Sequence, residues 1–126
     1  MEAQILNSLY EILEKIKNRP GLYIGHKSLD RLVGFISGYI VSTFELTGQW
    51  IPFSQFREYV EYKNNINHPV KHWSDIISQN RTQEEAFDLF FVYLDGFKEI
   101  SKDSEKFEDM LKSNQAKFLS DIKKNI

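Results

Sequence analysis

Apolar residues recur at three- and four-residue spacing along most of this chain, which is the pattern of amphipathic helices. The first such stripe consists of Ile5, Leu9, Ile12 and Ile16. Later stripes follow within residues 29–43, 53–60, 73–77, 87–97 and 107–122. The pattern predicts an all-α fold, a compact bundle of five to six helices in which residues 1–126 form a single domain.

Capping and breaking residues predict where these helices begin and end. The segment 18–21 (Asn-Arg-Pro-Gly) ends the first helix, because proline lacks an amide donor and glycine frees the backbone. Ser28 is the predicted N-cap of the second helix, and Thr47-Gly48 ends it. Thr82 and Glu85 have the spacing of a capping box. Residues 56–62 alternate like a strand, but we expect a helix from the context.

The helix over residues 87–97 is apolar on a wide face, so we place it at the centre of the bundle. Gly34 and Gly38 lie four residues apart within the second helix, where each costs about 1 kcal/mol relative to alanine. A close crossing of two helices would explain both. The residues that we expect in the core are Ile12, Leu13, Leu32, Ile36, Tyr39, Phe87, Phe90, Leu94 and Phe97.

Composition excludes several classes of function. The chain has no cysteine, which rules out disulfides, thiolate nucleophiles and cysteine-ligated zinc. The N-terminal segment is amphipathic and charged, unlike a signal peptide, and no apolar run approaches the roughly 20 residues of a spanning helix. We therefore expect a cytoplasmic protein without a membrane partner. The net charge of −2 argues against nucleic acid as the main partner.

The charge is unevenly distributed. Residues 75–109 contain ten acidic and four basic side chains, a local charge of −6, whereas residues 1–74 sum to +1 and residues 110–126 to +3. Such a block is either a solvated helix face or a recognition surface for a basic partner.

The segment RPGLYIG (19–25) is the most distinctive string in the chain. It looks locally like a string near the start of type II topoisomerase ATPase domains, but the phosphate loops and the acidic residue with a nearby asparagine of those domains have no counterpart here. We predict a connector between helices, with Leu22, Tyr23 and Ile24 packed back onto the core.

Two histidine patterns suggest chemistry that the rest of the chain does not support. Arg19 and His26 have the R-x₆-H spacing of a family of small helical RNases, without a second polar motif. His68 and His72 have the i, i+4 spacing of zinc ligands, but Pro69 lies between them and no glutamate follows His68. We expect no catalytic residue, no metal site, no cofactor and no small-molecule substrate.

The order of motifs resembles a family of small bacterial proteins. The resemblance rests on RPGLYIG, then SLDRLVGFISGY (28–39), aromatic residues at Phe53 and Phe56, Trp73 followed by Ile76-Ile77, and EEAFDLFFVYLDGF (84–97). It covers residues 5–97. The layout is similar to that of immunity proteins of polymorphic toxin and contact-dependent growth inhibition systems.

This resemblance implies a protein without activity of its own, which binds and neutralises a cognate toxin domain in the cytoplasm. The family's toxins are frequently nucleases, and nucleases are usually basic because they hold phosphates. An acidic helical face suits an inhibitor of such a toxin. A helical adaptor and a small helical nuclease using Arg19 and His26 remain alternatives. The candidate toxin-binding residues are Asp75, Glu84, Glu85, Asp88, Asp95, Glu99 and, as either a core anchor or an interface hot spot, Trp73.

Overall fold

The computed structural model describes residues 2–66 and 71–124, and in that part of the chain every regular element is a helix. The helices are α1 (Glu2–Asn18), α2 (Pro20–Tyr23), α3 (Leu29–Thr47), α4 (Gln55–Lys63), α5 (Trp73–Ser78), α6 (Gln83–Ser101) and α7 (Ser104–Lys124). The all-α prediction is confirmed, and the described residues contain seven helices where five to six were expected. The difference is α2, a single turn of helix inside the segment that we predicted as a plain connector.

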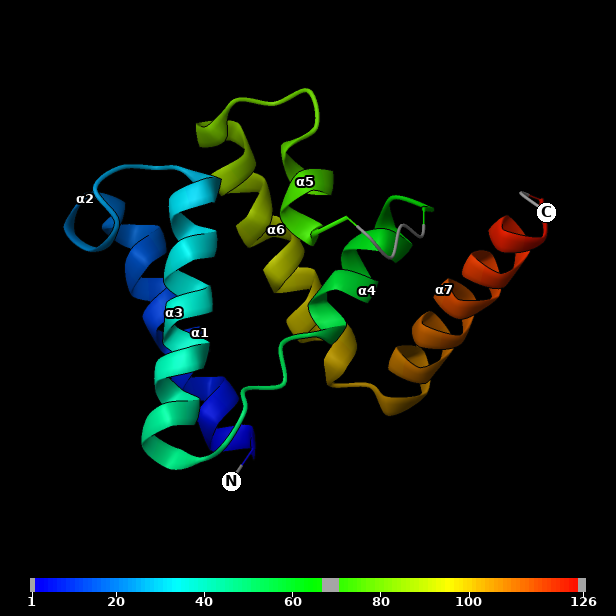
Figure 1. Ribbon diagram of the computed structural model, residues 1–126, viewed down its shortest axis with the longest axis horizontal. Coiled ribbons are helices and arrows are strands. Elements are labelled where there is room, and N and C mark those ends of the chain that lie inside the picture. Colours follow the sequence, from blue (N-terminus) through cyan, green and yellow to red (C-terminus); the bar gives the residue numbers. More distant parts are fainter. Residues whose placement is uncertain (1, 67–70, 125–126) are drawn as a thin grey trace.

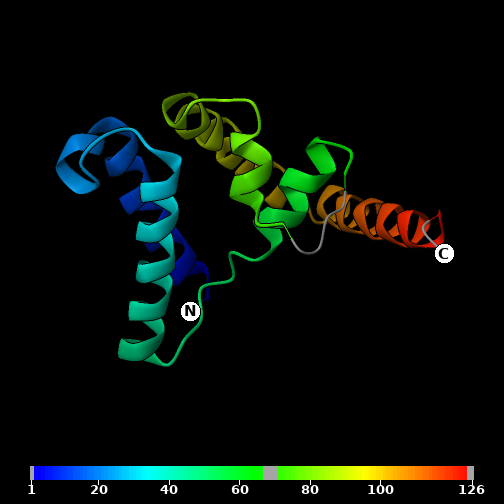
Figure 2. The same ribbon diagram turned by 45° about the horizontal axis from the view of Figure 1, so that its top comes forward.

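Helix α6 runs through the middle of the molecule, with α1, α2 and α3 on one side and α4 and α7 on the other (Figure 1). It contacts α3, α4, α5 and α7, and the turned view in Figure 2 keeps α3 and α7 on opposite sides. The central position predicted for residues 87–97 is confirmed. No helix of residues 2–66 and 71–124 combines the length and apolar character needed to cross a membrane.

The predicted helix boundaries are confirmed by their capping interactions. The Ser28 hydroxyl accepts the backbone N–H of Arg31 at 3.3 Å, at the start of α3. Gly48 ends that helix in the left-handed region, with φ of 72°, where glycine has no steric cost. Thr82 and Glu85 form the capping box of α6, in which each side chain accepts the other residue's backbone N–H at 3.1 Å.

The core is built around aromatic rings that pack against one another. The Phe56 ring on α4 lies 5.1 Å from Trp73 on α5 and 5.4 Å from Phe90 on α6, measured between centroids, in edge-to-face geometry. Seven of the nine residues predicted for the core are buried. Ile12 and Tyr39 are half-buried and pack against the core.

The close helix contact predicted at Gly34 and Gly38 was wrong. A Cβ atom at either position would meet no other atom within 4 Å, so both glycines lie on the open surface of α3. The close contact occurs at Gly96 instead, where the Tyr59 hydroxyl of α4 occupies the space that a Cβ would need. Sequence spacing marks a glycine inside a helix, but not the face on which it lies.

Because the surroundings of these glycines differ, replacing them with alanine should have opposite effects on the free energy of unfolding. Gly34→Ala and Gly38→Ala should each raise the free energy of unfolding by roughly 0.5–1 kcal/mol, because alanine orders the helix at lower entropic cost. Gly96→Ala should lower it by about 1–3 kcal/mol, because the methyl group displaces the Tyr59 ring. Urea unfolding of dilute protein measures all three. Equal changes in the free energy of unfolding at the three sites would contradict the close contact at Gly96 and the open surface at Gly34 and Gly38.

The connector prediction for residues 19–25 was partly wrong. Ile24 is buried as expected, and its carbonyl accepts a hydrogen bond of 3.0 Å from the Arg31 guanidinium. Leu22 is 69% exposed and Tyr23 is 37% exposed, so neither packs inward. The α2 turn directs these two side chains outward, because Pro20 at its first position begins a helical turn.

Candidate functional site

Four carboxylates form a continuous stripe along the exposed side of α6. They belong to Glu84, Asp88, Asp95 and Glu99, all exposed and spaced by four, seven and four residues. At 3.6 residues per turn, these positions fall within roughly 60° around the helix axis, and the stripe is about 22 Å long. We call these four residues the acidic stripe.

The same face carries an apolar side chain. Val92 lies between Asp88 and Asp95 and is 65% exposed, although it belongs to a helix whose other face is buried. The hydrophobic pattern does not single it out, because a lone valine among carboxylates fits a solvated face equally well. A single exposed apolar side chain is ordinary on a protein surface, and an apolar centre within a polar rim is also the arrangement of protein interfaces.

Two members of the stripe have partners within the molecule. Asp88 forms an ion pair with Lys27, which lies in the segment between α2 and α3; the carboxylate oxygen is 2.8 Å from the Lys27 ammonium. Glu99 forms an ion pair with Lys102 at 2.9 Å. The hydrogen bond to Asp88 raises the pKa of the Lys27 ammonium. In the described part of the chain, Glu84 and Asp95 have no ion pair. Sequence reasoning missed Lys27, because nothing in its local pattern links it to a residue 61 positions away.

The other candidate residues do not belong to the stripe. Glu85 is exposed, but its carboxylate accepts the Thr82 N–H in the capping box, which lowers its pKa. Asp75 is exposed on the neighbouring helix α5. Trp73 is only 6% exposed and packs against Phe56 and Phe90, so it is a core anchor. The structure therefore brings together four of the seven candidates.

The histidine pair is only partly described, since His68 lies outside the described residues. His72 is the N-cap of α5, where its Nδ1 accepts the backbone N–H of Ser74 at 3.1 Å. Its ring packs at a tilt against Trp73 with 4.8 Å between centroids, and partial burial lowers the pKa of the imidazole. Over residues 2–66 and 71–124, no group of three or more metal-ligating side chains occurs.

The role of His72 predicts a pH dependence of stability. A lowered pKa means that the unfolded chain binds the proton more readily, and protonated Nδ1 cannot accept the Ser74 amide. This contribution is complete above the unfolded pKa of about 6.5 and is lost as the pH falls through the folded pKa. Between about pH 7.5 and pH 5, the parent should lose more stability than His72→Asn, which keeps a capping acceptor. Parallel losses in urea unfolding would contradict this.

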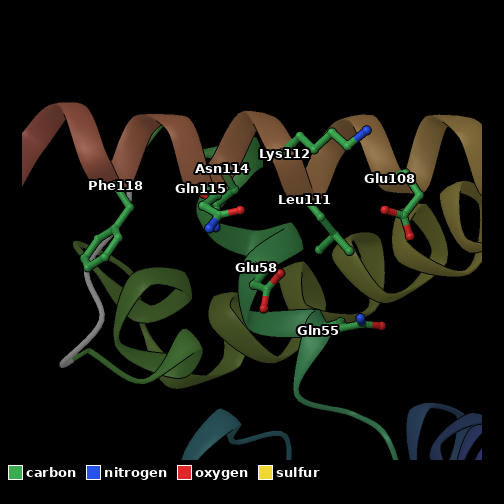
Figure 3. Close-up of a pocket in the computed structure, with 8 residues that line it drawn as sticks. All are labelled: Gln55, Glu58, Glu108, Leu111, Lys112, Asn114, Gln115 and Phe118. Atoms are coloured by element: carbon green, nitrogen blue, oxygen red, sulfur yellow. The ribbon is translucent and has the colours of Figure 1, made fainter.

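A groove with a volume of about 540 Å³ lies between α4 and α7, which also contact each other (Figure 3). Its lining consists of Gln55, Glu58, Glu108, Leu111, Lys112, Asn114, Gln115 and Phe118. Burial raises the pKa of the Glu58 carboxyl, and Glu61 adds to this, while Arg57 opposes it. Among the described lining residues there is no histidine, serine or threonine, so a hydroxyl nucleophile beside a histidine base does not occur among them.

Arg19 and His26 flank α2 on the surface. Both side chains are exposed, and within the described residues they form no hydrogen bond or ion pair with each other. Among the described residues, the R-x₆-H spacing therefore produces no direct contact between the two side chains.

No family model, curated protein or solved structure matches this chain. Among the candidate sites described above, the acidic stripe of α6 has the strongest geometric support.

Proposed function

We propose that this protein is an immunity protein, which binds and neutralises a basic toxin domain, of nuclease type, through the acidic stripe of α6. The observation that carries the proposal is the alignment of Glu84, Asp88, Asp95 and Glu99 on one exposed helix face around Val92. The local charge of −6 in residues 75–109 extends the acidic field beyond this helix. The proposed role is binding, without catalysis or cofactor.

Electrostatics favours such an interface in two ways. Clustered carboxylates on one face attract a basic partner and raise its association rate, an effect that salt screens. The carboxylates also compete for the lysine and arginine side chains with which a nuclease holds phosphates. The inhibitor would then occupy the groove that the nucleic acid needs.

The ion pairs already present on the stripe do not oppose this role. The Lys27–Asp88 and Glu99–Lys102 pairs are solvent-exposed, and water and salt screen such pairs so that they add little stability. A partner's cation can replace either lysine at little cost. Val92, which is 65% exposed, would be covered at the centre of the contact.

Co-expression with the protein domain encoded immediately upstream of this gene, which the proposal expects to be the toxin, tests the proposal. We expect a one-to-one complex on gel filtration and loss of the toxin's nuclease activity when one equivalent of this protein is added. Excess nucleic acid should slow formation of the complex, because both ligands use the same basic groove. An upstream domain that is acidic, or that neither binds nor is inhibited, would contradict the proposal. The purified protein alone should show no nuclease activity.

A further inference from the structure

Most of the outer face of α3 is exposed, and at its start the Arg31 guanidinium donates one hydrogen bond, to the Ile24 carbonyl at 3.0 Å. Arg31, Gly34, Gly38, Val41 and Glu45 are all exposed and follow one another at three- and four-residue spacing, which places them in one row. No other helix passes in front of α3 in either view (Figures 1 and 2). We call these five residues the α3 row.

The α3 row contains one exposed apolar side chain, Val41, and two aromatic ones follow it in the chain. Val41 is 49% exposed, Phe44 44% and Trp50 59%. The Phe44 and Trp50 rings pack edge to face with 5.0 Å between centroids, which orders this exposed aromatic pair. Contiguous apolar surface of this kind marks an interaction site more often than isolated exposed side chains do.

The fold itself does not require the two glycines of the row. Each costs about 1 kcal/mol in a helix interior, and neither contacts another element, as the open space around both shows. Their φ values are not in the left-handed region, so no turn demands them either. A second helix crossing over the row would make use of the missing side chains, because its backbone could approach closely.

The charges of the row identify the occupant. Arg31 and Glu45 each lie seven residues, or about two turns, from Gly38. If a second α3 crosses antiparallel at Gly38, two-fold symmetry places each Arg31 beside Glu45 of the second copy. The same symmetry places each Val41 level with Phe35 of the second copy, one residue from the exposed backbone at Gly34. The row is thus complementary to itself in both charge and shape.

We propose that two copies of this chain associate through the α3 row, with Gly38 at the two-fold crossing and the Val41, Phe44 and Trp50 side chains covered. The proposal is independent of the acidic stripe, which lies on α6. It places a homodimer interface on a surface that the toxin-binding proposal does not use.

Sedimentation velocity over a range of protein concentrations tests this dimer. We expect a reversible dimer with a Kd of roughly 1–100 µM, weakened at least about tenfold by Gly38→Leu and by Glu45→Arg. Gly38→Leu places a side chain at the crossing, and Glu45→Arg sets arginine against Arg31. Both changes lie on the open surface of the monomer, so at protein concentrations well below the dimer Kd neither variant should melt at a lower temperature than the parent.

The matched control is Glu14→Arg, the same charge change at an exposed position of α1, which should dimerise like the parent. A parent chain that stays monomeric at concentrations of several hundred micromolar overturns the proposal. So does a dimer that Gly38→Leu and Glu45→Arg leave unchanged, because its interface would then lie on another face.

Discussion

Replacing Phe90 with alanine is expected to lower the free energy of unfolding by about 3–5 kcal/mol, the range for emptying an aromatic core site. The Phe90 side chain is fully buried on α6 and contacts Trp73 of α5 and Phe56 of α4, at 5.3 and 5.4 Å between ring centroids. Its removal leaves a cavity where three helices meet. Domains are stable by only about 5–15 kcal/mol, so this one change removes a large part of the total.

Urea unfolding monitored by circular dichroism measures the loss. Val92→Ala is the matched control on the same helix, since Val92 is 65% exposed and its change should alter stability by less than about 0.5 kcal/mol. Similar losses for the two variants would show that α6 is not the centre of the core.

The helices could be predicted from local chemistry, because their period and caps are encoded in adjacent residues. Ser28, Thr82 and Glu85 cap the predicted ends, since a cap needs only neighbours in sequence. The direction of an irregular segment depends on distant packing instead. Local patterns therefore predict Tyr23 in the core, although it is exposed, and a close contact at Gly34 and Gly38, although it occurs at Gly96.

In the candidate site, too, features set by neighbouring residues could be predicted, and features set by distant packing could not. Helical spacing correctly placed Asp88, Asp95 and Glu99 on one exposed face, because positions 88 to 99 lie within a single helix. It could not place Asp75 relative to that face, because Asp75 belongs to another helix. Nor could it find the Lys27 ammonium beside Asp88, a contact made only by the folded chain.

Reversing Asp88 and Asp95 to lysine is expected to weaken toxin binding at least about a hundredfold, since close charge pairs in comparable interfaces couple by roughly 1.5–7 kcal/mol. Both side chains are exposed, so the fold should survive. The Lys27 ion pair that Asp88→Lys removes is solvent-exposed and adds little stability, so the melting temperature should change little.

Two further variants separate position from net charge. Glu11→Lys with Glu14→Lys makes the same change in charge on the exposed side of α1 and should leave binding nearly intact. Lys27→Gln releases Asp88 from its internal partner and should make association faster than in the parent. An equal loss for the two double reversals would indicate a general charge effect, without a specific role for the α6 face.

The most direct test of the central claim is the association rate of the toxin domain with the parent and with the Asp88→Lys/Asp95→Lys variant, at low and high salt. Binding through the acidic stripe predicts a fast parent rate that falls steeply between about 50 and 500 mM salt, because salt screens exposed charges. It predicts a slow, nearly salt-independent rate for the variant, together with loss of protection in a growth assay. A variant that associates as fast as the parent, with the same salt dependence and full protection, would contradict the claim, and the acidic stripe would be only a solvated helix face.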